Sequence, residues 1–439
     1  MRNRNGIGLA LLLALFAAGG CKSDPGSGDA RERERRASAL VDAMAAGNAS
    51  DARKDFNLIM RMSLSEGRLK QVWEGLVAQA GSFTNRLWTS QARQAGYEIV
   101  WIGLGFERGG MKAKVVFDSG DKVTGLFFQP WHEEAKPADY VDATRFHEQE
   151  VRFGKPGWEL DGTLTLPKGV TNVPSLVLVH GSGPNDRDET VGANKPFRDL
   201  AWGLAGRGIA VFRYEKRTKA HQAKMSQLRT LTVREETVDD AVLAAEFLGG
   251  RAEVDRSRVH VLGHSLGAHL GPRIAVRAKR LAGLILLAGN VRSLPELIVD
   301  QTEYLSSEGG DKEGLKGLRL AADRVRELSP ADEKSREVVL GAPMSYWFDL
   351  RDYDPVKTLE AFSGPILILH GERDYQVPMK DFELWKAGLA GRPNVTARSF
   401  PALNHLMISG TGRSTPFEYE TAGHVAGDVI DAIAEWIKD

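Results

Sequence analysis

The chain has 439 residues, which is long enough for two or three domains, and its 42% hydrophobic and 26% charged residues are typical of a globular protein. Lysine plus arginine and aspartate plus glutamate each number 58, so no net charge attracts nucleic acid or another polyanion. The single cysteine excludes internal disulfides and cysteine-based zinc clusters, and the sequence has neither a zinc-protease motif nor a phosphate-binding loop. We therefore expect no metal and no cofactor.

The first 20 residues have the pattern of an export signal. Basic residues precede an apolar run from Ile7 to Phe16, which is too short to span a bilayer. Small residues then lead to Cys21, a pattern that resembles the lipobox of bacterial lipoproteins. The resemblance implies that Cys21 is the lipid-carrying first residue of an exported cell-envelope protein. In a Gram-negative host the protein would face the periplasm or be anchored in the outer membrane. An ordinary cleaved signal with an incidental cysteine is the alternative.

Residues 21–48 are expected to form a tether and a charged helix, whose run of arginine and glutamate at 31–36 is typical of a solvent-facing helix surface. We expect a small α+β domain at 49–130. Helical spacing of apolar residues predicts two amphipathic helices, the first including Ile59 and Met62 and the second including Trp73.

Three β-rich runs separated by glycine turns then predict an antiparallel meander, at 97–106, 111–117 and 123–128. The order of these features, including Phe117-Asp118 and the Gly-Leu-Phe-Phe run at 125–128, resembles an uncharacterised domain found ahead of bacterial α/β-hydrolases. Prolines and charges at 131–143 are typical of a linker.

Residues 144–439 are expected to form the catalytic domain. An antiparallel pair opens it, at 146–153 and 158–166, and apolar strands then alternate with helices. The predicted strands lie at 175–179, 209–214, 259–262, 281–288, 365–369 and 395–400, and the predicted helices at 197–205, 233–248, 268–278 and 425–438. This alternation predicts a mostly parallel sheet covered by helices on both faces.

The third of these six strands ends in Gly263-His264-Ser265-Leu266-Gly267, directly before a predicted helix. A strand, a tight turn carrying serine and a helix together indicate a nucleophile elbow, which holds the serine hydroxyl clear of the sheet. The two glycines stand where the backbone approaches itself too closely for a Cβ. Ser265 is therefore the candidate nucleophile.

Together these features resemble the α/β-hydrolase fold over nearly all of residues 146–439. Besides the elbow, the resemblance rests on the motifs His180-Gly181-Ser182-Gly183-Pro184, Arg213-Tyr214-Glu215-Lys216-Arg217-Thr218, Gly371-Glu372-Arg373-Asp374 and Leu403-Asn404-His405. The family it indicates is that of bacterial serine esterases with an extra amino-terminal domain. The resemblance implies an α/β-hydrolase fold with a helical cap, preceded by a small α+β domain.

The fold requires the nucleophile, the acid and the histidine in that chain order, with the last two in loops after late strands. Asp374 has the position of the acid, with Glu372 and Asp381 as alternatives. His405 has the position of the general base, and His424, near the last helix, is its rival.

The oxyanion that develops during acyl transfer needs preorganised N–H donors. In this fold they are the backbone N–H after the nucleophile, here that of Leu266, and one from the loop after the first parallel strand. Ser182 is the expected second donor, and Gly183 is the alternative. His264, beside the nucleophile, is a candidate to contact the substrate.

A mainly helical insertion at about 290–363 interrupts the sheet pattern, with helices predicted at 294–305, 315–328 and 335–340. Insertions of this kind form a cap over the site and contribute to the acyl pocket. An aromatic cluster around Trp347 either contacts the substrate or packs within the cap.

These assignments predict a serine hydrolase that cleaves carboxylic esters of small or medium acyl chains through an acyl-enzyme intermediate. Thioesterases, acyltransferases and serine peptidases use the same triad and are the alternatives. A non-catalytic envelope binding protein would require a broken triad or oxyanion loop, and both are intact in the sequence.

Overall fold

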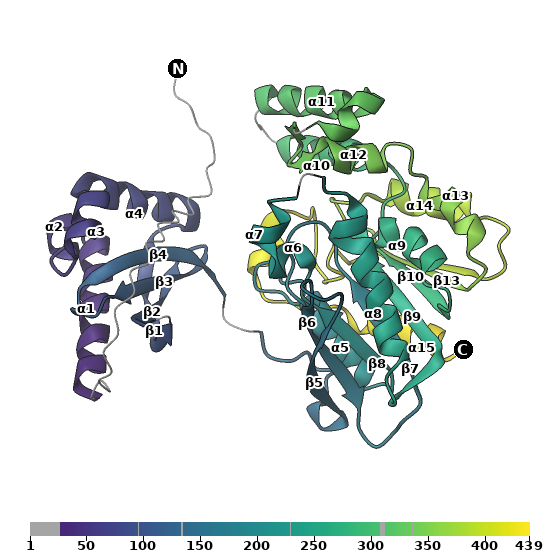
Figure 1. Cartoon of the computed structure of the whole chain (residues 1–439), viewed down its shortest axis with the longest axis horizontal. Helices are drawn as coiled ribbons and strands as arrows, with labels where there is room; N and C mark the ends of the chain where they lie inside the picture. The colour runs from purple at the N-terminus through teal and green to yellow at the C-terminus, as the bar shows by residue number, and fades with distance from the viewer. Residues whose placement is uncertain (1–26, 95, 133–134, 229, 308–311, 336) are drawn as a thin grey trace. The chain divides into compact units, whose positions relative to one another are not determined.

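The computed structural model describes residues 27–94, 96–132, 135–228, 230–307, 312–335 and 337–439. The chain divides into two compact units between Glu134 and Ala135, within the predicted linker (Figure 1). The predicted signal and Cys21 lie outside the described residues. None of the helices in the described ranges is long and apolar enough to cross a membrane.

The amino-terminal unit combines helices with a four-stranded antiparallel meander in the order β1-β2-β3-β4 (Figure 1). Its helices are α1 (Ser27–Ala45), α2 (Ala49–Ala52), α3 (Leu58–Ser63) and α4 (Glu66–Ala80). Its strands are β1 (Phe83–Gln94), β2 (Tyr97–Phe106), β3 (Gly109–Phe117) and β4 (Val123–Trp131). Apolar residues of α1, α2, α4 and the sheet form one core.

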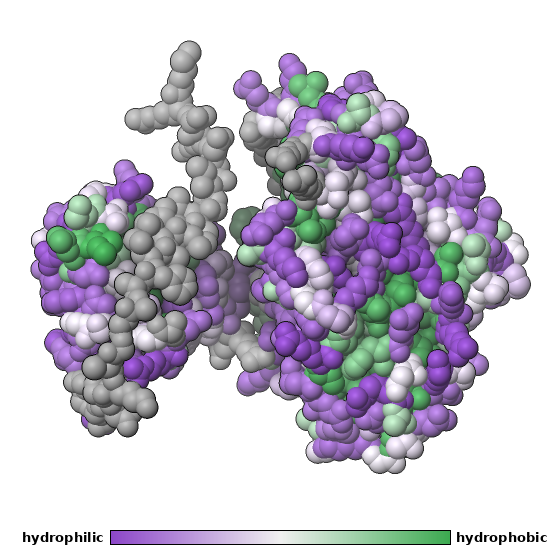
Figure 2. All heavy atoms as spheres, viewed as in Figure 1, coloured by the Kyte–Doolittle hydropathy of each residue, from purple (hydrophilic) through white to green (hydrophobic). Residues whose placement is uncertain are grey.

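Three predictions for this unit need correction. The sequence did not predict β1, because this edge strand is mostly exposed and polar and lacks an apolar alternation. The charged run in α1 is only partly solvent-facing, since Arg33 is buried and forms an ion pair with Asp121 at 2.6 Å. Ile59 and Met62 in the short helix α3 are 60% and 79% exposed rather than part of the core. Figure 2 shows the resulting hydrophobic area over α3.

The second unit contains an eight-stranded sheet in the order β14-β13-β10-β9-β7-β8-β6-β5. The six strands from β14 to β8 are parallel, whereas β6 runs antiparallel to both β8 and β5. The strands are β5 (Phe146–Phe153), β6 (Leu160–Pro167), β7 (Val173–Val179), β8 (Ala210–Tyr214), β9 (Val254–His264), β10 (Gly283–Leu287), β13 (Ile366–Gly371) and β14 (Val395–Phe400). All eight predicted strands are present, β5 and β14 with the predicted bounds and the other six with one or both ends shifted.

Helices cover both faces of this sheet (Figure 1). On one face, residues of α8 and α9 share a core with the sheet, and on the other face residues of α5 and α15 share a second core. The helices of this unit outside the cap are α5 (Pro196–Ala205), α6 (Arg217–Ala220), α7 (Gln222–Met225), α8 (Asp239–Gly249), α9 (Leu266–Arg277), α14 (Met379–Gly388) and α15 (Gly427–Lys438). A π-helical turn (Arg234–Val238) precedes α8, so the helix predicted at 233–248 is present in two parts.

The order of the strands determines where a crevice forms at the edge of the sheet. The chain passes from β7 to β8 on one side and then crosses to β9 on the other, so β7 and β9 are neighbours that lead away in opposite directions. In an open α/β sheet, such a switch point creates a crevice at the carboxyl ends of the strands. The loop after β7 and the elbow after β9 therefore meet at this crevice.

The insertion consists of α10 (Leu294–Ser306), α11 (Lys312–Arg326), α12 (Met344–Leu350) and α13 (Pro355–Thr358), with α10, α11 and α12 gathered at one end of the unit (Figure 1). The helix predicted at 335–340 is wrong. The short strands β11 (Val338–Val339) and β12 (Ala342–Pro343) form a hairpin there. Its two turn residues, Leu340 and Gly341, have φ of 48° and 79°, the left-handed conformation that tight hairpin turns require.

Candidate active site

Ser265 stands on a strained turn between β9 and α9. Its backbone has φ of 53° and ψ of −117°. Its carbonyl oxygen accepts a hydrogen bond from the N–H of His269, in the first turn of α9, at 3.0 Å. A Cβ on Gly263 would lie 2.1 Å from the carbonyl oxygen of Gly267, and a Cβ on Gly267 would lie 2.3 Å from that of Val179. Only glycine fits at both places, so the sequence forces the half-buried serine onto a sharp turn.

Asp374 and His405 meet beside this turn. Asp374, in the loop after β13, accepts from His405 Nδ1 at 2.6 Å through Oδ2, and His405 lies in the loop after β14. The other oxygen of Asp374 accepts from the backbone N–H groups of Gln376 and Val377 at 2.8 and 2.9 Å. With Nδ1 donating to the carboxylate, the second nitrogen of a neutral His405 has a free lone pair and is able to accept a proton.

His264, the residue before Ser265, lies between the elbow and His405. The ring of His264 lies 4.7 Å from that of His405, centroid to centroid, and His264 Nε2 lies 3.0 Å from the carbonyl oxygen of His405. Thus the structure brings the elbow and the predicted base together.

The alternative residues are engaged elsewhere. Glu372 is exposed and accepts from the hydroxyl of Ser399 at 2.8 Å. Asp381 is fully buried, where it forms an ion pair with Arg292 at 2.7 Å. Their described contacts do not include His405.

His424, the rival base, contacts a different carboxylate. Its Nδ1 lies 3.1 Å from Asp199 Oδ2, an oxygen that also accepts from the backbone N–H of Val425 at 3.1 Å. Because Asp199 belongs to α5, His424 helps to fasten the segment before α15 to the helical layer.

The loop after β7 passes directly against the nucleophile, because a Cβ on Gly181 would lie 3.1 Å from that of Ser265. The N–H of Gly181 donates to Glu189 Oε1 at 2.6 Å, so it is not available to a substrate. In the described part of the chain, the N–H groups of Ser182 and Leu266 make no hydrogen bond to the protein. Both are therefore free to donate to a substrate, and their role as oxyanion donors stays a prediction.

Comparison with known proteins agrees with this geometry. Residues 176–426 match the family described as "Alpha/beta hydrolase family". The esterase EstD of Thermotoga maritima is 44% identical over 379 residues, which are 86% of this chain and 89% of EstD. The chain belongs to the α/β hydrolase family. The predicted fold class, an α/β-hydrolase domain preceded by a small α+β domain, is confirmed. Residues 37–126 match a family described as "Protein of unknown function (DUF3887)".

Solved structures also resemble this hydrolase. Est1E from Butyrivibrio proteoclasticus has 16% sequence identity and a TM-score of 0.45, covering 66% of this chain and 97% of that protein. The esterase from the archaeon Pyrobaculum calidifontis has 16% identity and a TM-score of 0.44, covering 66% and 85% of the two chains.

Sequence reasoning missed the buried charges that surround the hydrolase's oxyanion loop. Glu189 is 3% exposed, and Lys216 is 2% exposed and donates to the carbonyl oxygen of Gly181 and to Glu236, both at 2.8 Å. Glu189 directly follows the charged run at 186–188, and Lys216 lies within the charged motif at 213–218. Burial of a charge is not visible in a sequence, because it depends on partners from other elements.

Two residues predicted to contact the substrate have other surroundings. His264 is 4% exposed and both of its ring nitrogens face protein atoms, so it lies behind the site rather than on its surface. Trp347 is 3% exposed, and its indole N–H donates to the carbonyl oxygen of Val339 at 2.7 Å. Packing within the cap therefore accounts for Trp347.

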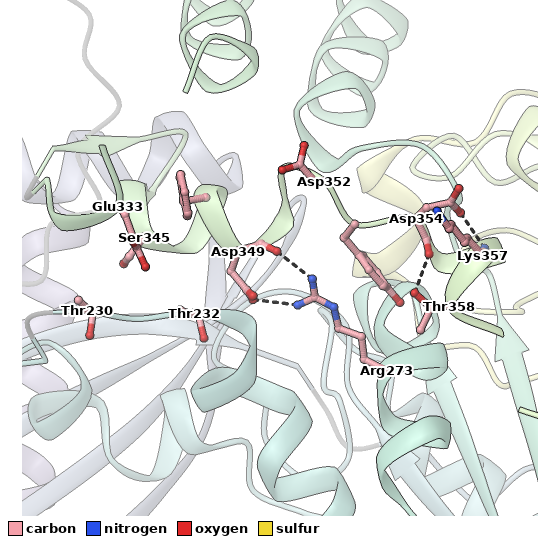
Figure 3. Close-up of a pocket in the computed structure, with 12 residues that line it drawn as sticks. Thr230, Thr232, Arg273, Glu333, Ser345, Asp349, Asp352, Asp354, Lys357 and Thr358 are labelled. Carbon is pink, nitrogen blue, oxygen red and sulfur yellow. Dashed lines mark hydrogen bonds and ion pairs between the residues drawn. The ribbon is translucent and has the colours of Figure 1, made fainter. Parts of the chain in front are cut away.

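A cavity of about 900 Å³ lies between the cap and α9, and neither Ser265, Asp374 nor His405 lines it. Figure 3 shows Arg273 of α9 reaching Asp349 of the cap, which are 2.9 Å apart, with Thr230 and Thr232 on the side opposite the cap. Arg273 lies about 10 Å along α9 from its start, at 1.5 Å per residue. The lining is rich in carboxylates, so this cavity does not have the character of an acyl pocket.

Among the described residues, no three histidine, cysteine, aspartate or glutamate side chains are grouped to hold a metal ion.

Proposed function

We propose that this protein is a serine carboxylesterase in which Ser265 is the nucleophile, His405 the general base and Asp374 the residue that orients it. The observation that carries the proposal is the buried 2.6 Å contact between His405 Nδ1 and Asp374 Oδ2, next to a serine on a strained elbow. The 44% identity to an esterase over most of both chains supports the same reaction class.

In the proposed reaction, His405 takes the hydroxyl proton of Ser265 as the oxygen attacks the ester carbonyl. The oxyanion that forms accepts from the N–H groups of Leu266 and Ser182. His405 then gives its proton to the leaving alcohol, which departs and leaves an acyl-enzyme. Water then attacks the acyl-enzyme as His405 takes one of its protons. His405 gives that proton to the Ser265 oxygen as the acid is released.

The proposed substrates are carboxylic esters of small or medium acyl chains. Thioesters and aminoacyl amides are the competing substrate classes, because the same triad serves all three. The test is a panel of esters of increasing acyl length, matched thioesters and aminoacyl amides, assayed with the soluble part of the chain. We expect kcat/KM to be highest for short or medium esters. A higher value for amides or thioesters would reassign the substrate class.

We further propose that the hydrolase is attached to the cell envelope through a lipid on Cys21. The proposal rests on the sequence alone: a basic start, a short apolar run and small residues precede the only cysteine. The enzyme would then act on esters outside the cytoplasm.

A further inference from the structure

Glu189 occupies an unusual position next to the proposed site. It lies in the loop between β7 and α5, its side chain is 3% exposed, and its φ is 50°. A left-handed backbone at a residue other than glycine is uncommon and is retained where the surroundings require it. One carboxylate oxygen accepts from the N–H of Gly181 at 2.6 Å, and the other lies 2.8 Å from His264 Nδ1.

His264 contacts both Glu189 and the proposed base, His405. Its Nδ1 lies 2.8 Å from a Glu189 oxygen, in an ion-pair contact that is not aligned as a hydrogen bond, and its Nε2 lies 3.0 Å from the carbonyl oxygen of His405. Both nitrogens are therefore next to oxygens that only accept. A neutral imidazole has one N–H and would turn a lone pair toward one of these oxygens, whereas an imidazolium has two. The geometry therefore favours a charged His264.

The surrounding charges agree with that protonation state. Burial lowers the pKa of His264, but the nearby Glu189 carboxylate outweighs burial and the net shift is upward, with a smaller contribution from Asp374. Burial raises the pKa of Glu189, but the contact with His264 and the hydrogen bond from the N–H of Gly181 lower it, and the net shift is downward. Burial lowers the pKa of His180 to about 4, so this third histidine is neutral. Lys216 faces the same loop through the carbonyl oxygen of Gly181.

We propose that Glu189 is a positioning residue that holds two parts of the catalytic machinery at once, the oxyanion loop through the N–H of Gly181 and the main chain of His405 through a charged His264. The proposal rests on the proposed function. Because Lys216 holds the carbonyl oxygen of Gly181 while Glu189 holds its N–H, the loop is fixed on both sides of this residue, next to the Ser182 donor. Misplacement of such groups by about 1 Å lowers a rate on the order of 10²-fold.

The test replaces Glu189 with glutamine. Glu189→Gln keeps an oxygen for the N–H of Gly181 but removes the charge that faces His264. The matched control is Asp199→Asn, because Asp199 is also a buried carboxylate that contacts one histidine Nδ1 and one backbone N–H, but at His424 and Val425. We expect kcat for an ester to fall on the order of 10²-fold in Glu189→Gln and less than about threefold in Asp199→Asn, with thermal melting reported for both.

A second measurement does not depend on activity. Nitrogen-15 NMR of the histidine side chains, assigned by the signal that disappears in His264→Gln, reports the protonation of His264 directly. We expect a charged ring at neutral pH in the unmodified protein and a neutral ring in Glu189→Gln. A neutral His264 in the unmodified protein overturns the proposal, as does an unchanged kcat in a folded Glu189→Gln. Failure of the esterase proposal is recognised separately, because the unmodified protein would then not turn over esters whatever the state of His264.

Discussion

His405 donates through Nδ1 to Asp374 Oδ2 at 2.6 Å, while two backbone N–H groups hold the other oxygen of Asp374. In Asp374→Asn the amide oxygen would keep the two backbone donors, so the amide NH₂ would face His405. The ring would then carry its proton on the nitrogen that should accept from Ser265. We expect kcat for an ester to fall about 10⁴-fold, with the fold retained.

Glu372→Gln is the matched control, because Glu372 is an exposed carboxylate in the same loop and contacts Ser399 rather than His405. Its kcat should stay within about threefold of the original value, because the described contact of Glu372 is to Ser399 and not to the proposed base. A large loss in this variant combined with a small one in Asp374→Asn would show that the acid is misassigned.

The proposed nucleophile is tested by removing its hydroxyl. Ser265→Ala should abolish both ester turnover and covalent labelling by an organophosphonate, while circular dichroism and melting temperature stay close to those of the unmodified protein. Ser182, on the neighbouring oxyanion loop, provides the control: Ser182→Ala keeps the backbone N–H that is proposed to act, so labelling should persist. Labelling that survives in Ser265→Ala would end the assignment.

The charged pair of Glu189 and His264 makes stability depend on pH. The folded pKa of His264 is raised above its reference of 6.5, so its contribution is complete below about pH 6.5 and is lost as pH rises through the folded pKa. The folded pKa of Glu189 is lowered below 4.5, so its contribution is complete above about pH 4.5 and is lost as pH falls through the folded pKa.

The stability difference between the unmodified protein and Glu189→Gln should therefore be largest between about pH 4.5 and 6.5, at about 3 kcal/mol for the loss of one partner of a buried pair. Urea unfolding followed by loss of organophosphonate labelling reads the transition of the catalytic unit. A difference that stays constant from pH 4 to 9 would contradict a charged pair.

The sequence was sufficient where a structure depends on local pattern. The buried strands are runs of apolar residues, and the elbow is fixed by glycines whose Cβ atoms would collide with backbone, as at Gly263. Chain order then placed Asp374 and His405 at the ends of the last two strands.

Features that depend on distant partners could not be predicted. The edge strand β1 is polar, so its pairing with β2 leaves no apolar alternation. Arg33 is buried where it pairs with Asp121, and Glu189 where it contacts Gly181 of its own loop and His264 at the end of β9. Local sequence does not identify such partners, although an acidic run shortly after the glycine-rich motif at 180–184 is a signal to look for in other sequences.

The proposed lipid anchor is tested by replacing the only cysteine. Cys21→Ser should move the protein from the membrane fraction to the soluble fraction and abolish labelling by a fatty-acid analogue. Ester hydrolysis in extracts should stay unchanged, because the proposed catalytic residues lie in the separate unit after Glu134. Continued lipid labelling of this variant would rule out Cys21 as the modified residue.

The last prediction separates the two histidines that compete for the role of base. In His405→Gln the proton acceptor beside Ser265 is lost, so the burst of product that accompanies acyl-enzyme formation should disappear. In His424→Gln the contact to Asp199 weakens, and the loss of a charge-assisted contact near the surface is expected to cost about 1–2 kcal/mol of unfolding free energy. Its burst should remain, because Asp199 and His424 fasten α5 to the segment before α15 and do not contact the elbow in the described structure. Rapid-quench kinetics and thermal melts of both variants decide the matter. A burst that persists in His405→Gln but vanishes in His424→Gln would move the base to His424.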